Sequence, residues 1–165
     1  MGKKLTGENI LNSMRTFFGN DTRRIKHAEK VFGYAMDILD AEGCDREIVE
    51  AAAALHDIGI HEAERKYGSP AGNYQEIEGP PIAEKILEEY DIDSEKVIHI
   101  CRIIANHHSA RDIDTCEFRI IWDADWLVNI PDELNMEDKK MLKSFIARTF
   151  KTGRGRDVAE KLFLN

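Results

Sequence analysis

The sequence predicts an all-α fold in which a single domain is built as a bundle of helices. Nearly every segment places apolar residues three or four positions apart, as one face of a helix does, and no alternating strand pattern extends beyond a few residues. The 165 residues are enough for one domain with a substantial core. We therefore expect one domain over residues 1–165, with its main body at about 21–130 and C-terminal helices at 135–163 packing on it.

The first third of the chain is expected to form three helices. Residues 8–18 carry apolar side chains on one face. The turn "GND" then precedes a long helix at about 21–42, which Gly43 ends. A third helix, at about 45–57, contains a run of alanines, and Gly59 is expected to end it.

A stretch rich in glycine and proline, "KYGSPAGNYQEIEGPP", interrupts this pattern. Because both residue types break regular structure, we expect a loop over residues 67–81 that acts as a flap over a site. Helical periodicity resumes after it and predicts helices at about 81–90, 94–108, 115–129, 135–151 and 156–163.

Composition and charge argue against several classes of function. The 31 acidic and 23 basic residues give a formal net charge of −8, which disfavours binding to polymeric nucleic acid or to an anionic membrane. No apolar run approaches the roughly 20 residues of a membrane helix, and the N-terminus lacks the apolar stretch of a signal peptide. Cys44, Cys101 and Cys116 have no CxxC spacing, so the sequence indicates neither a disulfide framework nor a thiolate zinc site. We therefore expect a cytoplasmic protein.

Several polar side chains fall where the apolar stripes of the expected helices predict core. Positions three, four or seven apart share a helix face, and by this test both His27 and His56 lie on apolar stripes. Asp123 points to the side opposite Asp125. The full set on the stripes or at their ends comprises His27, His56, Asp57, His107, His108 and Asp125.

A shared cation would explain this set. Burying such groups without a partner costs several kcal/mol each. A backbone carbonyl or a helix end satisfies a single buried histidine or carboxylate in most proteins, but one cation would satisfy the whole set together. Nitrogen and carboxylate ligands suit Mn, Fe, Mg, Co, Ni or Zn, and the sequence does not distinguish among them. The sequence therefore predicts a site for a divalent metal ion.

The order and spacing of these residues resemble the HD-domain superfamily of metal-dependent phosphohydrolases. The resemblance rests on His27 in "RRIKHAEKVFGYA", His56 and Asp57 in "AAALHDIG", and Asp125 in "IIWDADWLVNI", and it spans roughly residues 21–130. It implies a helical bundle of the HD-domain type in which these four residues bind one divalent metal. In the last motif of the superfamily the aspartate after alanine is the ligand, which again favours Asp125 over Asp123.

A second metal is left open. The pair His107 and His108 in "NHHS" resembles the branch of the superfamily that holds two metals. That branch also has a histidine in the region of "YQEIEGPPIAEKIL", where this chain has Gln75, Glu76 and Glu78 instead. We therefore expect one metal site, with a second in doubt unless a glutamate substitutes as a ligand.

Other residues are candidates for catalysis and for binding substrate. Asp57 is expected to orient the attacking water, and His107 or His108 either donates a proton to the leaving oxygen or holds a second ion. His61, beyond a glycine, is left undecided. The candidates for binding substrate are Lys26, Arg65, Lys66 and Asn129, the last because it matches an active-site asparagine of guanosine-tetraphosphate hydrolases in the superfamily.

The sequence thus predicts a metal-dependent phosphohydrolase that uses a metal-activated water on a phosphate ester, either a nucleotide or another small phosphorylated molecule. Three alternatives stay open: a metal-binding regulatory or ligand-binding HD module without turnover, a di-iron protein with oxygenation chemistry, and a helical bundle without metal. The expected partner is the small phosphorylated substrate, with neither polymeric nucleic acid nor a membrane. A homodimer is left open.

Overall fold

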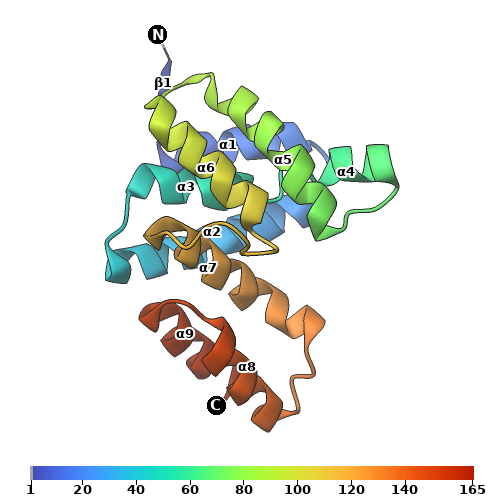
Figure 1. Cartoon of the computed structure of the whole chain (residues 1–165), viewed down its shortest axis with the longest axis vertical. Coiled ribbons are helices and arrows are strands. Elements are labelled where there is room, and N and C mark those ends of the chain that lie inside the picture. The colour runs from blue at the N-terminus through green and yellow to red at the C-terminus, as the bar shows by residue number, and fades with distance from the viewer. Residues whose placement is uncertain (1) are drawn as a thin grey trace.

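Nine helices and a two-stranded parallel sheet make up residues 2–165, the part of the chain that the computed structural model describes (Figure 1). The helices are α1 (Gly7–Phe18), α2 (Thr22–Glu42), α3 (Arg46–Leu55), α4 (Ile60–Tyr67), α5 (Gly72–Leu87), α6 (Ser94–Asn106), α7 (Cys116–Glu133), α8 (Lys139–Thr149) and α9 (Gly153–Phe163). The strands β1 (Lys3–Lys4) and β2 (Tyr90–Asp91) pair Lys3 with Tyr90 and Lys4 with Asp91. The prediction of an all-α fold is confirmed.

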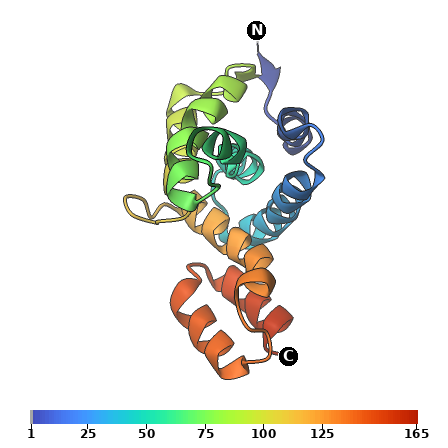
Figure 2. The same cartoon turned by 90° about the vertical axis from the view of Figure 1, so that its right-hand side faces the viewer.

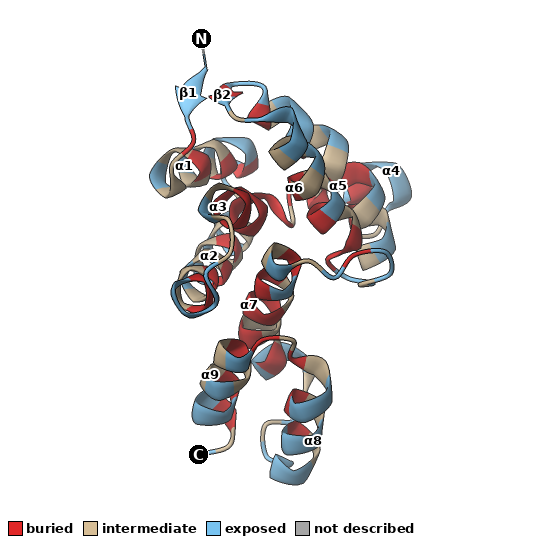
Figure 3. Ribbon diagram, turned by 60° about the vertical axis from the view of Figure 1, so that its left-hand side comes forward, coloured by how far each residue is buried: buried red, intermediate tan, exposed pale blue. Residues whose placement is uncertain are grey.

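Helix α3 lies at the centre of the fold. All of its residues from 48 to 55 are buried, and it packs against α1, α2, α6 and α7. The alanines at 51–54 have small side chains, so neighbouring helices can surround α3, and a helix that is apolar all round is a buried one. Residues that directly follow α3 therefore start inside the molecule (Figure 3).

The C-terminal helices α8 and α9 form a hairpin on one side of α7, and the N-terminal part of the chain lies on its other side (Figure 2). The buried carboxylate of Asp123, on α7, connects the two parts. It accepts hydrogen bonds of 2.8 Å from the backbone N–H of Lys151, 2.8 Å from that of Thr152 and 2.7 Å from the Thr152 hydroxyl. Arg154 on α9 also donates to Asp37 on α2 at 3.0 Å. The start of α9 is thereby fixed on α7 and α2.

Gly59 does not end α3, contrary to the prediction. α3 ends at Leu55, a turn covers residues 56–59, and Gly59 precedes the first residue of α4. Its φ of −83° requires no glycine. The reason for glycine is a close approach of two backbones, because a Cβ at Gly59 would lie 2.5 Å from the backbone nitrogen of Gly79 on α5.

The predicted flap over residues 67–81 is also wrong for most of its length. Only residues 68–71 link α4 to α5, and α5 includes both Pro80 and Pro81. Each proline removes one helical hydrogen bond, a loss that normally ends a helix. Here α5 packs against both α4 and α6, and this burial outweighs the loss. The proline signal is local, whereas the packing that overrides it is not.

Cys44 and Cys116 form a disulfide, which corrects the expectation of unpaired cysteines. The bond joins the turn after α2 to the first residue of α7, across a sequence separation of 72 residues. Only the packing of distant helices brings the two residues together, so no short-range spacing indicates the pair. The cysteines consequently give no support to the expected compartment. Cys101 is free and half-buried, and burial raises the pKa of its thiol to about 11.

None of the helices in residues 2–165 combines the length and apolar character that crossing a membrane requires.

Alanine substitutions at two glycines are predicted to have opposite effects on stability. Gly59→Ala should lower the free energy of unfolding by about 1–3 kcal/mol, because its Cβ meets backbone atoms that cannot rotate away. Gly33→Ala, inside α2 with nothing within 4 Å of the added Cβ, should raise it by roughly 0.5–1 kcal/mol. Urea denaturation of both variants measures the difference. Equal stability of Gly59→Ala and the unsubstituted protein would contradict the close approach of α4 and α5.

Candidate metal centre

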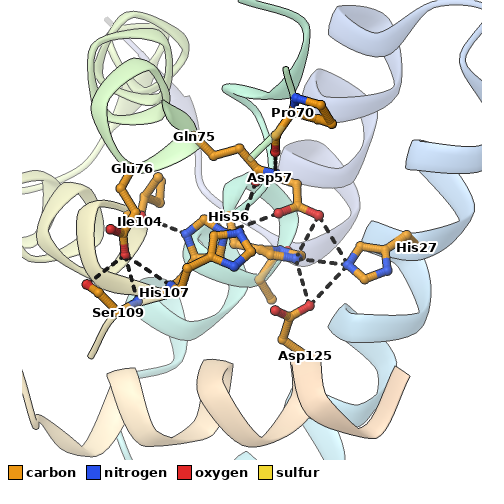
Figure 4. Close-up of polar contacts among 12 residues, drawn as sticks. His27, His56, Asp57, Pro70, Gln75, Glu76, Ile104, His107, Ser109 and Asp125 are labelled. Atoms are coloured by element: carbon orange, nitrogen blue, oxygen red, sulfur yellow. Dashed lines mark hydrogen bonds and ion pairs between the residues drawn. The ribbon is translucent and has the colours of Figure 1, made fainter. Parts of the chain in front are cut away.

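Four polar side chains from three parts of the chain converge on one point (Figure 4). His27 comes from α2, His56 and Asp57 from the turn after α3, and Asp125 from α7. The Nε2 atom of His27 lies 3.2 Å from Nε2 of His56, 3.1 Å from Oδ1 of Asp125 and 3.2 Å from Oδ2 of Asp57. Nε2 of His56 lies 3.4 Å from the same two carboxylate oxygens. Two nitrogens and two oxygens thus face one another.

Backbone carbonyls fix the orientation of two imidazole rings in the same way. Nδ1 of His56 donates to the carbonyl of Ala53 at 2.8 Å, and Nδ1 of His107 donates to that of Ile104 at 2.7 Å. Each histidine directly follows a helix, where the last carbonyls lack helical partners. A proton on Nδ1 leaves Nε2 as the atom that can bind a metal.

Asp57 faces two groups of potential ligands at once. Its Oδ2 atom belongs to the cluster with His27 and His56, whereas Oδ1 lies 3.2 Å from Nε2 of the buried His107. The ring of His108 stacks beside that of His107, with centroids 4.0 Å apart. Asp57, His107 and His108 therefore form a second set of atoms close enough to share an ion.

The electrostatics of the cluster are those of two carboxylates balanced by two imidazoles. Desolvation alone would lower the pKa of His27, but hydrogen bonds to Asp125 and Asp57 outweigh it and raise that pKa to about 9. Burial also lowers the pKa of His56, but Asp57 and Asp125 outweigh this effect and raise that pKa well above the usual range. Burial would raise the pKa values of Asp57 and Asp125, yet the histidines hold both well below the usual range.

The side of His108 away from His107 contacts α5. Its Nε2 lies 3.2 Å from Oε1 of Gln75, whose amide nitrogen donates to the carbonyl of Pro70 at 2.7 Å. Desolvation and the neighbouring His107 lower the pKa of His108 to about 4. At neutral pH this imidazole is uncharged and offers a lone pair.

A cavity of about 630 Å³ opens beside the cluster. His27, Asp57 and Asp125 lie on its wall together with Gln75 and His108. Positive charge comes from α2 and negative charge from the end of α7. The further charged or polar residues that line it are Arg23, Arg24, Lys26, Lys30, Asn129, Asp132 and Glu133.

Comparisons with known proteins identify the family. Residues 24–130 match the HD domain. The chain belongs to the HD domain family. The solved structure of a protein described as a predicted HD superfamily hydrolase, from an uncultured Thermotogales bacterium, is similar to this HD protein with a TM-score of 0.68. The two sequences are 27% identical, and the match covers 93% of this chain and 83% of the other. A comparison with curated proteins found no match.

The residues of this HD protein fit the metal on which HD domains depend. His27, His56 and Asp57 present ligand atoms within 4.8 Å of one another, and an oxygen of Asp125 lies 3.1 Å from the first of these residues. Nitrogen and carboxylate oxygen together suit a first-row divalent ion better than a soft thiophilic one. The family resemblance that the sequence analysis described is confirmed, and the identity of the metal remains a matter of proposal.

Three residues that the sequence suggested for the site lie elsewhere. Arg65 pairs with Glu62, and Lys66 pairs with Glu78 at 2.9 Å. His61 lies 2.7 Å from a carboxylate oxygen of Asp21. Arg65, Lys66 and His61 line a different cavity, because α4 directs them away from the HD cluster. The structure therefore does not bring Arg65 and Lys66 together with the cluster.

The two glutamates of α5 that could substitute for the histidine of the two-metal branch have other partners. Glu76 accepts hydrogen bonds from the backbone N–H groups of His108 and Ser109, at 3.1 and 2.9 Å. Glu78 binds Lys66 and the hydroxyl of Tyr67, which lies 2.9 Å away. Gln75 is the candidate whose side chain is hydrogen-bonded to the imidazole ring of His108.

Sequence analysis missed Lys30 as a residue of the cavity. It follows Lys26 by four positions, so the two lysines share a face of α2. The rule that residues four positions apart share a helix face, which placed His27 on an apolar stripe, also predicts that Lys30 lies beside Lys26.

Metal retention is predicted to separate the two neighbouring aspartates of α7. His56→Ala, Asp57→Ala and Asp125→Asn should each lose bound metal, because each removes a ligand atom of the cluster. Asp123→Asn should keep the metal but lower the free energy of unfolding by roughly 1–3 kcal/mol, because it weakens hydrogen bonds to a buried charge. Metal analysis of the purified variants, with urea denaturation alongside, checks both. If Asp123→Asn lost the metal and Asp125→Asn kept it, Asp123 rather than Asp125 would be the ligand.

Metal affinity is predicted to rise with pH at least up to about 9. In the metal-free protein at pH 7 His27 is protonated, because its pKa is about 9, and a bound metal must displace that proton. Each displaced proton strengthens binding by about tenfold per pH unit below that pKa. Calorimetric titration with Mn²⁺ in two buffers of different ionisation enthalpy counts the protons. An affinity that does not change between pH 7 and 8.5 would argue against this state of His27.

Proposed function

We propose that this HD protein is a metal-dependent hydrolase of phosphate esters and that it acts on a nucleotide or another small phosphorylated molecule. The observation that carries the proposal is a cationic wall next to the metal cluster in an acidic protein. Lys26 and Lys30 line the same cavity as His27 and Asp125, although the chain as a whole has a net charge of −8. The similarity to a protein described as a predicted HD superfamily hydrolase supports the reaction class.

The cluster would hold one divalent ion through His27, His56, Asp57 and Asp125. When bound, such an ion lowers the pKa of a coordinated water toward neutrality and withdraws charge from a phosphoryl oxygen. We expect the carboxylate of Asp57, whose two oxygens face His27 and His107, to accept a hydrogen bond from the attacking water. If a second ion binds, the Oδ1 atom of Asp57 and Nε2 of His107 would be its first ligands.

The residues that line the cavity are suited to a phosphate and to a polar group of the same substrate. Lys26 and Lys30 would contact phosphate oxygens, which bind ammonium groups in charge-assisted hydrogen bonds. Asp132 and Glu133, at the end of α7, would accept hydrogen bonds from hydroxyl groups of a sugar. Asn129 lies on the same helix and offers both a donor and an acceptor.

His108 is the better placed of the two neighbouring histidines to act on substrate. It lines the cavity, whereas His107 is buried and directs Nε2 at Asp57. An uncharged imidazole accepts a proton or binds a metal, so we propose that His108 does one of these rather than donating a proton to the leaving oxygen.

Phosphate release from a panel of substrates tests the proposal. The panel comprises nucleoside mono-, di- and triphosphates and sugar phosphates, each with Mn²⁺, Fe²⁺, Mg²⁺, Co²⁺, Ni²⁺ or Zn²⁺. At least one combination should release inorganic phosphate, and His56→Ala, prepared in parallel, should release none. Bound metal without release from any substrate would instead favour the regulatory or ligand-binding module.

Two lysine variants test the cationic wall. Lys26→Ala and Lys30→Ala should each raise KM about tenfold, equivalent to about 1.4 kcal/mol, and change kcat less. Lys143→Ala on α8 is the matched control, because Lys143 is exposed and does not line the cavity. Unchanged KM in both cavity variants would remove these lysines from the binding site.

A further inference from the structure

A further group of potential metal-binding atoms lies at the start of α7. The Sγ atoms of Cys44 and Cys116 and a carboxylate oxygen of Glu117 all lie within 4.8 Å of one another. Cys116 is the first residue of α7, and Asp125 of the HD cluster follows it by nine positions, about 13 Å along the helix. The group is therefore separate from the HD cluster.

The carboxylate of Glu117 is already held in place. Its Oε2 atom accepts a hydrogen bond of 2.8 Å from the backbone N–H of Asp45, directly after Cys44. Its Oε1 atom lies 3.9 Å from Nε2 of His99, which is hydrogen-bonded to the Thr115 hydroxyl at 2.7 Å. The Oε2 atom is thus fixed by a backbone hydrogen bond, whereas the contact of Oε1 with His99 is longer than a hydrogen bond. A ligand fixed by an outer hydrogen bond is a typical feature of metal sites.

A disulfide alone does not require this carboxylate, because a disulfide is uncharged. Once the bond is reduced, a carboxylate beside two thiols repels a thiolate unless a cation lies between them. Two thiolates and one carboxylate form a soft, negatively charged set that favours Zn²⁺ over Mg²⁺ or Mn²⁺. Water would complete a tetrahedral site.

We propose that Cys44, Cys116 and Glu117 bind one Zn²⁺ ion when the two cysteines are reduced to thiols. Formation of the disulfide then abolishes this zinc site, which is separate from both metal positions of the HD cluster. The exposed Cys116 gives the ion and a reductant access from solvent. In both states the turn after α2 is linked to the start of α7, so the ion and the disulfide connect the same two segments.

The two states differ by two electrons and two protons. A trialkylphosphine reduces the disulfide: the S–S bond breaks, one water gives its oxygen to phosphorus as a phosphine oxide, and its two hydrogens become the thiol protons. Zn²⁺ then displaces both protons as it binds the two sulfurs.

Cobalt substitution tests the site without interference from the HD cluster. The full-length protein is reduced with a trialkylphosphine, stripped of metal and titrated with Co²⁺. Sulfur-to-cobalt charge-transfer absorption in the near ultraviolet reports thiolate ligands only, and the HD cluster contributes nitrogen and oxygen. We expect this absorption to grow to one equivalent, to disappear on addition of Zn²⁺, and to be absent from the oxidised protein.

Variants of the three ligands and of one other cysteine complete the test. Cys44→Ser and Cys116→Ser should lose the absorption, and Cys101→Ser, the matched control, should keep it. Glu117→Gln leaves both thiols and can still accept from Asp45, and it should weaken Co²⁺ binding at least about tenfold. The proposal is overturned if the reduced protein, folded by circular dichroism, shows no charge-transfer absorption. It is equally overturned if the absorption persists in the two serine variants, or if Glu117→Gln binds Co²⁺ as tightly as the unsubstituted protein.

Discussion

The site depends on two largely buried carboxylates, Asp57 and Asp125, that face the same two imidazole nitrogens. Two carboxylates in one buried cluster repel each other, and removing each charge from water costs free energy. Positive charge must therefore lie between or beside the two groups. His27 and His56 supply that charge as protonated imidazoles when no metal is bound. A divalent ion takes over the same role with the same side chains. The protein can therefore keep one arrangement of the cluster in both states, so the cost of organising the ligands falls on folding rather than on binding.

The surrounding helices are arranged to satisfy this requirement. The alanine-rich α3 brings its C-terminal turn into the interior, and α2 and α7 pack against one another to present His27 and Asp125 from either side. The cavity beside the cluster is lined by charges of both signs, the lysines of α2 and Asp132 and Glu133 of α7. A local field of this kind attracts and orients an anion even when the net charge of the protein is negative.

The sequence predicted those features that depend on neighbours along the chain. Helix faces repeat every few residues, so a polar residue such as His56 can be recognised on an apolar stripe without any knowledge of the fold. Features that arise from packing could not be read in this way. Pro80 lies inside a helix because of the helices beside it, Cys44 meets a cysteine 72 residues away, and Lys66 turns to Glu78 on the next helix. Family resemblance supplied the ligand set, but not the surroundings of the ligands.

The hydrogen bonds between Asp123 and the start of α9 have a consequence for where the folding unit ends. The match to the HD domain stops at residue 130, yet the donors to this carboxylate come from residues 151 and 152. A fragment cut at the family boundary would lose these donors and would uncover the side of α7 on which α9 packs, two residues from Asp125. The segment recognisable by similarity is thus shorter than the segment that must fold together. Substitutions in the α8–α9 hairpin can therefore affect the position of Asp125, because the hairpin packs on the helix that carries this residue.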